Sequence, residues 1–424
     1  MSADELLEHP APHCSGWLAR LVSGFCRLLA FGELKICFPD GTVARYHGRF
    51  AGCTGVLEIR HPRMLVLRLL LRGEVGFGEA YMDGHWDSPD LTALLEVLQN
   101  NEEHLQTVWQ GIRWSCARDR LIHRDSIVRH AEPDSDFYQR WLDDSMSYSC
   151  AVFEDAQTES LELAQQRKYL GLLDSLRATP GDHILDLGCG WGGFAEVAAH
   201  HGLRVTGVTR SPEQLDYARS RMMMAGVADQ VTLRLGDDRD IQGQFDHAVS
   251  IGMLEMVGEA RWLDYYQTLR RLVRPGGRIA LQVITIMDDV FPIYRIRPDF
   301  VQIHIFPGGM LPAPEHLAHA ARDAGLLIRE TRWFGDDYAE TLRRWRVRFQ
   351  HAAEEIDALG YDEPFRRMWD YYLAYCEAGF RTGVIDLVQT VLEVPADRPC
   401  DDQAKPICFT TARKSVGSNA GAHR

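Results

Sequence analysis

The sequence has no cysteine pair with C-x-x-C spacing, no apolar run long enough to span a bilayer, and no excess of basic residues. Its 10 cysteines are scattered singly, which argues against a zinc site and is typical of reduced thiols in the cytoplasm. With 60 acidic residues against 46 basic ones, the formal net charge is −14. Because nucleic-acid binding needs a concentrated positive surface, this balance argues against a general nucleic-acid-binding protein.

A secretion signal is not expected either, since residues 1–5 lack the basic start and cleavable apolar core of such a segment. The most apolar early run, residues 17–31, is too short to cross a bilayer and contains Arg20 and Arg27. Its apolar positions predict an amphipathic helix that packs on its own domain, with insertion into a membrane surface as the alternative. We therefore expect a cytoplasmic protein without transmembrane segments.

The length of 424 residues leaves room for more than one core, so we expect two domains. Residues 1–100 are predicted to form a small α+β domain, and residues 101–140 a helical linker rich in Arg and His. That linker has a solvated charged face, with phospholipid headgroup binding as the alternative. A larger domain is expected over residues 141–412, followed by a disordered tail at 413–424.

Short strands with turns are predicted in the small domain from Leu34 onward, with further apolar runs at 55–59 and 64–71. A β-turn at residues 39–41 fits their Pro-Asp-Gly sequence. Residues 73–86 interleave four glycines with aromatic and acidic side chains. This mixture predicts a tight, specific loop.

The larger domain has a βα rhythm. Strands are predicted at 183–188, 203–209, 231–235, 245–251, 278–286, 326–334 and 387–394. Helices are predicted at 161–176, from 211, through 262–272, and at 314–324, 338–359 and 363–378. Such alternation is typical of a doubly wound, mostly parallel sheet. Ligands of such sheets bind at the carboxyl ends of the strands.

The chain is organised around residues 184–194, an apolar run that ends in glycines and then acquires helical composition. A strand, a glycine turn and a helix together place a ligand against the positive helix N-terminus. Gly188, Gly190 and Gly193 also satisfy the G-x-G-x-x-G spacing of a dinucleotide site, but the next strand does not end in the acid that NAD requires. With Asp186 before the glycines, we expect S-adenosylmethionine, with NAD or a purely structural turn as alternatives.

Several further stretches resemble the cyclopropane-fatty-acyl-phospholipid synthases, in the family's order and over nearly the whole chain. They are Tyr-Ser-Cys-Ala at 148–151, Gly-Val-Thr at 207–209 with Glu-Gln at 213–214, Ser-Ile-Gly-Met-Leu-Glu-Met-Val-Gly at 250–258, Ile-Phe-Pro-Gly-Gly-Met-Leu-Pro at 305–312 and Phe-Gly-Asp-Asp-Tyr at 334–338. Residues 76–84 resemble that family's N-terminal domain. The resemblance implies an α/β fold: a doubly wound, seven-stranded class I methyltransferase (Rossmann-like) sheet with a smaller N-terminal α+β lipid-associated domain.

The resemblance also implies an activity. In that family S-adenosylmethionine gives its methyl group to a cis double bond in the acyl chain of a membrane phospholipid, and bound bicarbonate removes a proton to close a cyclopropane ring. The implied partners are unsaturated phospholipid acyl chains at the membrane surface. Peripheral association with the inner face of the membrane and a homodimer are further expectations.

Positions that match the family's cofactor residues are Tyr148, Ser149, Asp186, Gly188, Gly190, Thr209 and Gln214. By this resemblance the glycine turn would hold the methionine end of the cofactor. The 148–149 segment would close over it, and the side chains at 209 and 214 would lie near the ribose.

Positions that match the family's catalytic residues, around the bicarbonate, are Cys150, Glu255, Gln282, Ile284 and Tyr338. No metal is implied, and residues 306–312 would help to wall the acyl tunnel. Methyl transfer to an alkene leaves a cation that water would trap, so the pocket must be dry, and the aromatic face of Tyr338 can stabilise the cation. Glu255 is expected to share a proton with bicarbonate rather than to act as the base. Simpler roles remain open: a buried apolar side chain for Cys150, a helix cap for Glu255 and plain packing for Tyr338.

Two positions depart from the family's pattern. Gln282 stands where many members have a histidine, and Met256 stands where a histidine often follows the glutamate. An amide can donate a hydrogen bond to an oxyanion but carries no charge. We therefore expect ring formation, with a methyl-branched or methylene product as the alternative. A small-amine or carrier-bound substrate and a non-catalytic lipid-binding protein are the remaining hypotheses.

Overall fold

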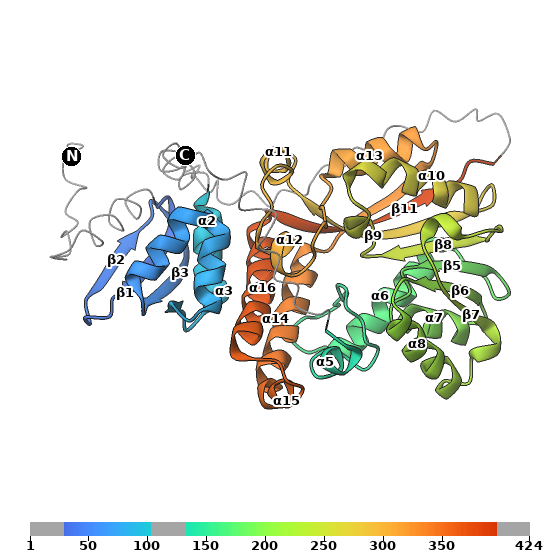
Figure 1. Cartoon of the computed structure of the whole chain (residues 1–424). Coiled ribbons are helices and arrows are strands. Elements are labelled where there is room, and N and C mark those ends of the chain that lie inside the picture. Colours follow the sequence, from blue (N-terminus) through green and yellow to red (C-terminus); the bar gives the residue numbers. More distant parts are fainter. Residues whose placement is uncertain (1–28, 103–132, 397–424) are drawn as a thin grey trace, which may run out of the picture. The chain divides into compact units, whose positions relative to one another are not determined.

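The computed structural model describes residues 29–102 and 133–396 (Figure 1). Within this part, the chain forms two compact units that are each built from separate segments. The first unit comprises residues up to 165 together with 292–309 and 335–385, and the second comprises 166–291, 310–334 and the residues from 386. The division reflects which segments pack compactly together. It does not test the domain boundaries predicted above, which stay a prediction. The predicted helix before residue 29, most of the linker and the tail lie outside the described residues.

The first unit contains a small sheet with the strand order β2-β1-β3-β4. Its strands are β1 (Phe31–Cys37), β2 (Val43–His47), β3 (Phe50–Ile59) and β4 (Trp86–Asp87). A turn joins β1 to β2, in which Gly41 donates its N–H to the carbonyl of Phe38 at 3.0 Å. Two helices accompany the sheet: α2 (Pro62–Met82) and α3 (Leu91–Asn100), which Asp90 caps by accepting the N–H of Ala93.

The predictions for residues 64–71 and 73–86 were wrong, because both stretches contribute to helix α2. The helix begins with Pro62 in its first turn, where the missing N–H is not needed, and is interrupted at Gly73, with φ 57°. Residues 75–82 continue as helix and include Gly76 and Gly78, while Gly84 lies in the turn between α2 and β4.

Close packing explains two of these glycines. A Cβ atom on Gly76 would lie 2.2 Å from the carbonyl oxygen of Arg68, and one on Gly78 would lie 2.5 Å from a ring carbon of Phe300. Phe300 begins α12 (Phe300–His304), far along the sequence. The glycines therefore allow close approach within a helix rather than a sharp turn.

The remaining helices of the first unit include two long ones that pack along each other. The described helices are α5 (Ser135–Gln139), α14 (Gly335–His351), α15 (Ala353–Ala358) and α16 (Glu363–Thr382). The predicted helix 338–359 is thus two helices, which meet at Ala352. Asp370 on α16 accepts hydrogen bonds from the Tyr81 hydroxyl and from the Arg346 guanidinium, both at 2.8 Å. This buried carboxylate joins α2, α14 and α16.

The second unit is built on a seven-stranded sheet with the order β10-β11-β9-β8-β5-β6-β7. The strands are β5 (His183–Leu187), β6 (Arg204–Thr209), β7 (Val231–Leu235), β8 (His247–Ile251), β9 (Arg278–Ile286), β10 (Leu327–Trp333) and β11 (Ile385–Glu393). The pairs from β9 through β7 are parallel, and β10 pairs with β11 in antiparallel fashion. The predicted doubly wound, mostly parallel sheet is confirmed.

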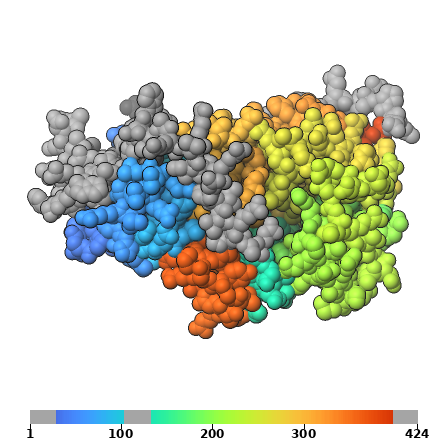
Figure 2. Space-filling model, in the orientation of Figure 1, coloured from blue at the N-terminus to red at the C-terminus, as the bar shows by residue number. Residues whose placement is uncertain are grey.

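Helices cover both faces of this sheet (Figure 1). They are α6 (Leu161–Leu176), α7 (Gly193–His200), α8 (Pro212–Met224), α9 (Leu254–Val257), α10 (Trp262–Leu272) and α13 (Pro314–Asp323). The short helix α11 (Phe291–Tyr294) belongs to the first unit from Pro292 onward. Buried side chains of α6 and α7, such as Leu176 and Phe194, pack on Ile184 and Val205 of the sheet. Figure 2 shows the surface of this unit in green and yellow, the colours of the segments from α7 to β9. Across the described ranges, no helix is long and apolar enough to cross a membrane.

Candidate functional site

The glycine turn lies at the carboxyl end of β5, in the middle of the seven-stranded sheet. Gly188 has φ 82° and Gly190 has φ 52°, a left-handed conformation that L-residues rarely adopt. The N–H groups of Gly188 and Cys189 both donate to the carbonyl of Val208 on β6. A Cβ on Gly188 would lie 2.2 Å from the side chain of Met253, whereas one on Gly190 would meet open space. The turn is therefore closed on one side and open at Gly190.

Helix α7 starts directly after this turn. Its N-cap is Gly192, which is also left-handed and offers no side-chain cap. The N–H groups of the first helical turn thus receive no side-chain acceptor, so the positive end of α7 remains available to a negatively charged or polar ligand group.

Asp186 lies on β5 just before the glycines, with only 2% of its surface exposed. In the part of the chain that the structure describes, its Oδ2 atom has no hydrogen-bond partner. Burial raises the pKa of this carboxyl to about 7. An orphaned buried carboxyl fits a cationic ligand group, because a nearby positive charge favours its ionised form. S-adenosylmethionine carries such a charge on its ammonium group, so this position fits the predicted cofactor.

Thr209 and Gln214 are brought together at the end of β6. The Thr209 hydroxyl donates to Oε1 of Gln214 at 2.8 Å and accepts the N–H of Ser211 at 3.2 Å. Ser211 in turn caps α8, as its composition predicted. The pair is therefore fixed at the carboxyl ends of the strands, as the glycine turn is, and its role near the ribose stays a prediction.

Two acidic residues at this edge were not predicted. Asp237 and Asp238 follow β7, and the preceding Gly236 donates its N–H to the carbonyl of Thr209 at 3.0 Å. Asp238 accepts two hydrogen bonds from Arg261, at 2.9 and 3.0 Å. The sequence did contain a signal for these two residues. Acids that directly follow a predicted strand of a parallel sheet lie at the carboxyl ends of the strands, where ligands bind.

Glu255 is buried in the short helix α9, with 7% of its surface exposed. Its Oε1 atom accepts the N–H of Ile284 on β9 at 2.6 Å, so Glu255 binds a neighbouring strand rather than capping its own helix. Oε2 has no hydrogen-bond partner among the described residues. Burial raises the pKa of this carboxyl to about 7. The arrangement presents one oxygen that can share a proton with a small oxyanion.

Gln282 lies two residues before Ile284 on β9, and therefore on the same face of the sheet. Its Oε1 atom accepts a hydrogen bond from Nε2 of Gln389 on β11 at 2.9 Å. The side chain is almost fully buried, with 1% exposed. The amide that replaces the family's imidazole is thus held by a residue that sequence analysis did not single out.

The segment 310–312 closes one side of Glu255. Met310 donates its N–H to the Glu255 carbonyl at 2.8 Å, and Ile286 donates its N–H to the carbonyl of Pro312 at 3.1 Å. These contacts seat the end of the predicted tunnel-wall segment beside α9 and β9. Met256, at the second departure from the family's pattern, is 44% exposed.

The other predicted site residues belong to the first unit and are described there. The Tyr148 hydroxyl donates to the Tyr372 hydroxyl at 2.9 Å, and burial raises the pKa of Tyr148 well above its usual value. The carbonyl of Ser149 accepts Nε2 of Gln165 at 2.8 Å. The first contact holds the side chain of Tyr148, and the second holds the backbone of Ser149.

Cys150 and Tyr338 are buried in the same unit. The Cys150 thiol has no exposed surface and donates to the carbonyl of Ala151 at 3.0 Å. Tyr338 on α14 stacks on Phe380 of α16, with ring centroids 4.5 Å apart. Their geometry accommodates both the simple packing roles and the roles that the family resemblance implies, which remain predictions.

Comparisons with known proteins agree with this geometry. The family model described as mycolic acid cyclopropane synthetase matches residues 119–390. The tuberculostearic acid methyltransferase UfaA1 of Mycobacterium tuberculosis is 38% identical over 380 residues, which cover 85% of this chain and 87% of that protein. The cyclopropane-fatty-acyl-phospholipid synthase of Escherichia coli K12 is 35% identical over 344 residues, covering 79% and 87%.

A solved structure of similar fold is the mycolic acid cyclopropane synthase CmaA1 in complex with S-adenosylhomocysteine (SAH) and CTAB. It superposes with a TM-score of 0.57 at 28% identity and covers 61% of this chain and 93% of that one. The glycine turn, the seven-stranded sheet and these matches lead to one conclusion. The chain belongs to the mycolic acid cyclopropane synthetase family of S-adenosylmethionine-dependent methyltransferases.

Proposed function

We propose that this methyltransferase transfers the methyl group of S-adenosylmethionine to the cis double bond of an unsaturated fatty acyl chain in a membrane phospholipid. We further propose that the product is a cyclopropane ring. The observation that carries this proposal is the Glu255 carboxyl, which is buried, binds Ile284 through one oxygen and has no partner for the other among the described residues. Such a group suits a reaction in which a proton must leave the substrate in a dry pocket.

The chain's own residues have distinct tasks in this proposal. Asp186 and the open side of the turn at Gly190 bind the charged methionine end of the cofactor, which supplies an electrophilic methyl group when bound. Glu255, oriented by the Ile284 N–H, holds a small oxyanion. Bicarbonate, when bound there, would supply a mobile base for the substrate's proton. The backbone N–H groups of Ile284 and Met310 fix the carboxyl and the backbone of Glu255, and Glu255 itself is buried, as a cationic substrate carbon that must escape hydrolysis requires.

A second product is favoured by a specific observation. Gln282 is neutral and its carbonyl oxygen is already engaged by Gln389, so it offers no positive charge to a bound anion. Slower proton removal at the ring-forming carbon would let a different proton leave. Loss of that proton leaves a carbon–carbon double bond, so a methyl-branched alkene or a methylene chain would result. The mycobacterial relative is likewise named a methyltransferase rather than a cyclopropane synthase.

The substrate's location belongs to the same proposal. A phospholipid acyl chain has to be taken from a bilayer, so we propose a cytoplasmic enzyme that associates peripherally with the inner face of the membrane. A homodimer is proposed with it. Nucleic acid is not proposed as a partner, because the net charge of −14 is unfavourable for binding phosphates.

The test incubates the purified full chain with S-adenosylmethionine and vesicles of cis-monounsaturated phospholipid, followed by mass spectrometry of the acyl chains. We expect chains heavier by one CH₂, and NMR then distinguishes ring, branch and methylene. Vesicles of fully saturated phospholipid are the control and should gain no mass. If the protein binds SAH in calorimetry but no chain gains mass, the proposed reaction is wrong; if SAH does not bind either, a non-catalytic lipid-binding protein is favoured.

The two glycines of the turn allow a matched prediction. Gly188→Ala should lower the stability by about 2–4 kcal/mol, because the left-handed conformation and the overlap with Met253 both add cost. Gly190→Ala adds the conformational cost alone, about 1 kcal/mol, but its Cβ enters the open side of the turn. Thermal unfolding and SAH calorimetry on both variants check this.

For Gly190→Ala we expect a small loss of stability together with a loss of SAH affinity of about tenfold or more. Gly188→Ala should show the larger drop in unfolding temperature. Unchanged SAH affinity in Gly190→Ala would contradict the assignment of the open side to the cofactor.

A further inference from the structure

The second unit has a cleft of about 300 Å³ at the amino ends of its parallel strands. The cleft lies where the neighbouring strands β5, β8 and β9 begin, whereas the glycine turn follows the carboxyl end of β5. It is therefore separate from the site described above. Its lining residues that carry a charge, or can acquire one, are Arg177, Asp182, His247, Arg274, Arg278 and Glu393.

Two of the three arginines in this cleft have carboxylate partners. Arg274 pairs with Asp246, with 2.6 Å between Nη1 and Oδ1, and its side chain is 52% exposed. Nε of Arg278 lies 3.8 Å from Oε2 of Glu393. The same carboxylate accepts hydrogen bonds from Arg329 on both of its oxygens, at 2.8 and 3.1 Å. Glu393 therefore faces two guanidinium groups at once.

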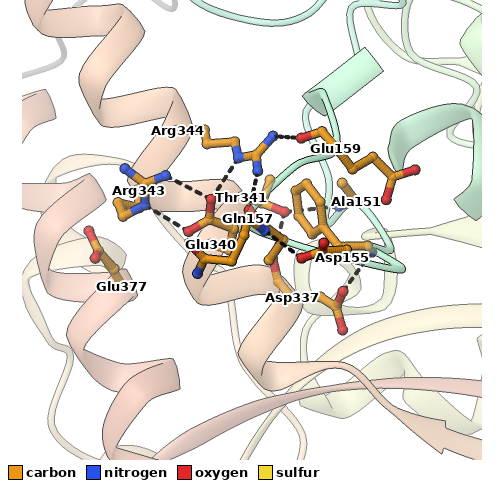
Figure 3. A network of polar contacts seen from close by, with 12 residues as sticks. Ala151, Asp155, Gln157, Glu159, Asp337, Glu340, Thr341, Arg343, Arg344 and Glu377 are labelled. Carbon is orange, nitrogen blue, oxygen red and sulfur yellow. Dashed lines mark hydrogen bonds and ion pairs between the residues drawn. The ribbon is translucent and has the colours of Figure 1, made fainter. Parts of the chain in front are cut away.

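The third arginine, Arg177, differs from these two. It directly follows α6, and among the residues that the structure describes no carboxylate pairs with its guanidinium. Figure 3 shows the opposite arrangement in the first unit, where Glu340 binds both Arg343 and Arg344 of α14. Burial lowers the pKa of Arg278, and the positive charge of Arg177 lowers it further, so these two guanidinium groups lie close enough to repel each other.

The other ionisable groups of the cleft already have hydrogen-bonding partners. Oδ2 of Asp182 accepts the N–H and the hydroxyl of Thr179, at 2.8 and 3.0 Å. Nδ1 of His247 accepts the N–H of Arg278 at 3.1 Å, and burial lowers the pKa of the His247 ring. The ring is therefore neutral near pH 7, and the positive charge of the cleft comes from its arginines.

The backbone of Arg177 also indicates that its side chain has a purpose. Its φ is 54°, and Met146 is the only other non-glycine residue with a positive φ in the described ranges. Glycine is the usual residue at such a helix end, because a Cβ makes the left-handed conformation costly. The N–H of Arg177 donates to the carbonyl of Asp174 at 2.9 Å, a contact that any residue can make. Strain of this kind is often found at binding sites.

We propose that this cleft binds a phosphate group through the guanidinium groups of Arg177 and Arg278, with Arg274 at the rim. Guanidinium groups match phosphate oxygens in geometry and charge, and one phosphate offers enough oxygens for two of them. The volume of about 300 Å³ is larger than a lone phosphate needs and suits a small phosphate ester. The group belongs either to a free phosphate ester or to a phospholipid headgroup, because both present the same oxygens.

The test measures the binding of glycerol 3-phosphate to the full chain by calorimetry and, separately, cosedimentation with vesicles of phosphatidylglycerol. Arg177→Gly removes the guanidinium and suits the left-handed backbone, so the folded protein should bind with a Kd about tenfold higher and without loss of unfolding temperature. Arg177→Lys keeps the charge and should lose less affinity. The matched control is Arg219→Gln on α8, where the side chain is 56% exposed, and it should bind like the wild type.

The two measurements distinguish the sources of the phosphate group. Binding of glycerol 3-phosphate alone indicates a free ester, whereas binding to vesicles alone, if it depends on Arg177, indicates a lipid headgroup. The proposal is overturned if the wild type binds neither probe, or if Arg177→Gly binds like the wild type. SAH should bind Arg177→Gly with the wild-type Kd, because the glycine turn lies at the other ends of the strands. The outcome is therefore independent of whether the enzyme methylates lipid.

Discussion

Glu255→Gln should lower kcat by at least about 100-fold and leave the Kd for SAH within twofold of the wild type. Glutamine keeps an oxygen that accepts the N–H of Ile284, so the contact at 2.6 Å between α9 and β9 survives. The amide group, which would replace the Oε2 atom of Glu255, cannot share a proton with an oxyanion bound there. Single-turnover methyl transfer to vesicle lipid, together with SAH calorimetry, separates the two effects.

Glu315→Gln is the matched control, because Glu315 lies exposed in the first turn of α13 and the change in charge is the same. A pH series sharpens the test. Burial raises the pKa of Glu255 to about 7, and the protonated carboxyl is the form that donates to an anion. The rate of the wild type should therefore fall as the pH rises through about 7, and Glu255→Gln should lack this dependence. A variant that retains more than a tenth of the wild-type rate would rule out the proton-sharing role.

The parts of the site that could be predicted from the sequence are those in which neighbouring residues determine the geometry. A buried strand followed by glycines and a helix places Asp186 and Gly188 at a sheet edge whatever the rest of the chain does. Ser211 likewise caps the helix that it precedes, as its residue type predicts. The βα alternation predicts a doubly wound sheet for the same reason, since it depends on local periodicity.

The parts that could not be predicted depend on residues far apart in the sequence. Helix α2 was mistaken for a strand and a loop partly because Gly78 is needed for close packing against Phe300, which lies in another segment. Gln282 accepts its hydrogen bond from Gln389 on β11, and no neighbouring residue in the sequence indicates this contact. The same holds for Glu255, whose position before a short helix suggested a cap, while its carboxyl binds the backbone of β9.

Asp186→Asn should make the ligand-free protein more stable at pH 8 and weaken cofactor binding. Burial raises the pKa of Asp186 from 3.8 to about 7, so the folded state holds its proton where the unfolded state has released it. The unfolded state thus binds fewer protons between pH 4 and 7, and the stability of the ligand-free wild type falls as the pH rises through this range. The full difference corresponds to roughly 4 kcal/mol. Asparagine removes the buried charge but buries an amide without partners, so we expect a net gain of about 2 kcal/mol at pH 8 and none at pH 4.

Asp186→Asn should lower the affinity for the cofactor, because the cofactor's cationic end loses its carboxylate partner. A charge-assisted hydrogen bond contributes about 1.5–3 kcal/mol, so the Kd for SAH should rise about 10- to 100-fold. Asp182→Asn is the matched control at the other end of β5, where hydrogen bonds from Thr179 and the nearby His247 hold the pKa of the carboxyl below its usual value despite partial burial. Its substitution should cost stability at pH 8 and spare SAH binding. Denaturant unfolding at pH 4 and pH 8 with SAH calorimetry measures both variants, and an Asp186→Asn protein that is less stable at pH 8 but binds SAH normally would show that this carboxyl is structural.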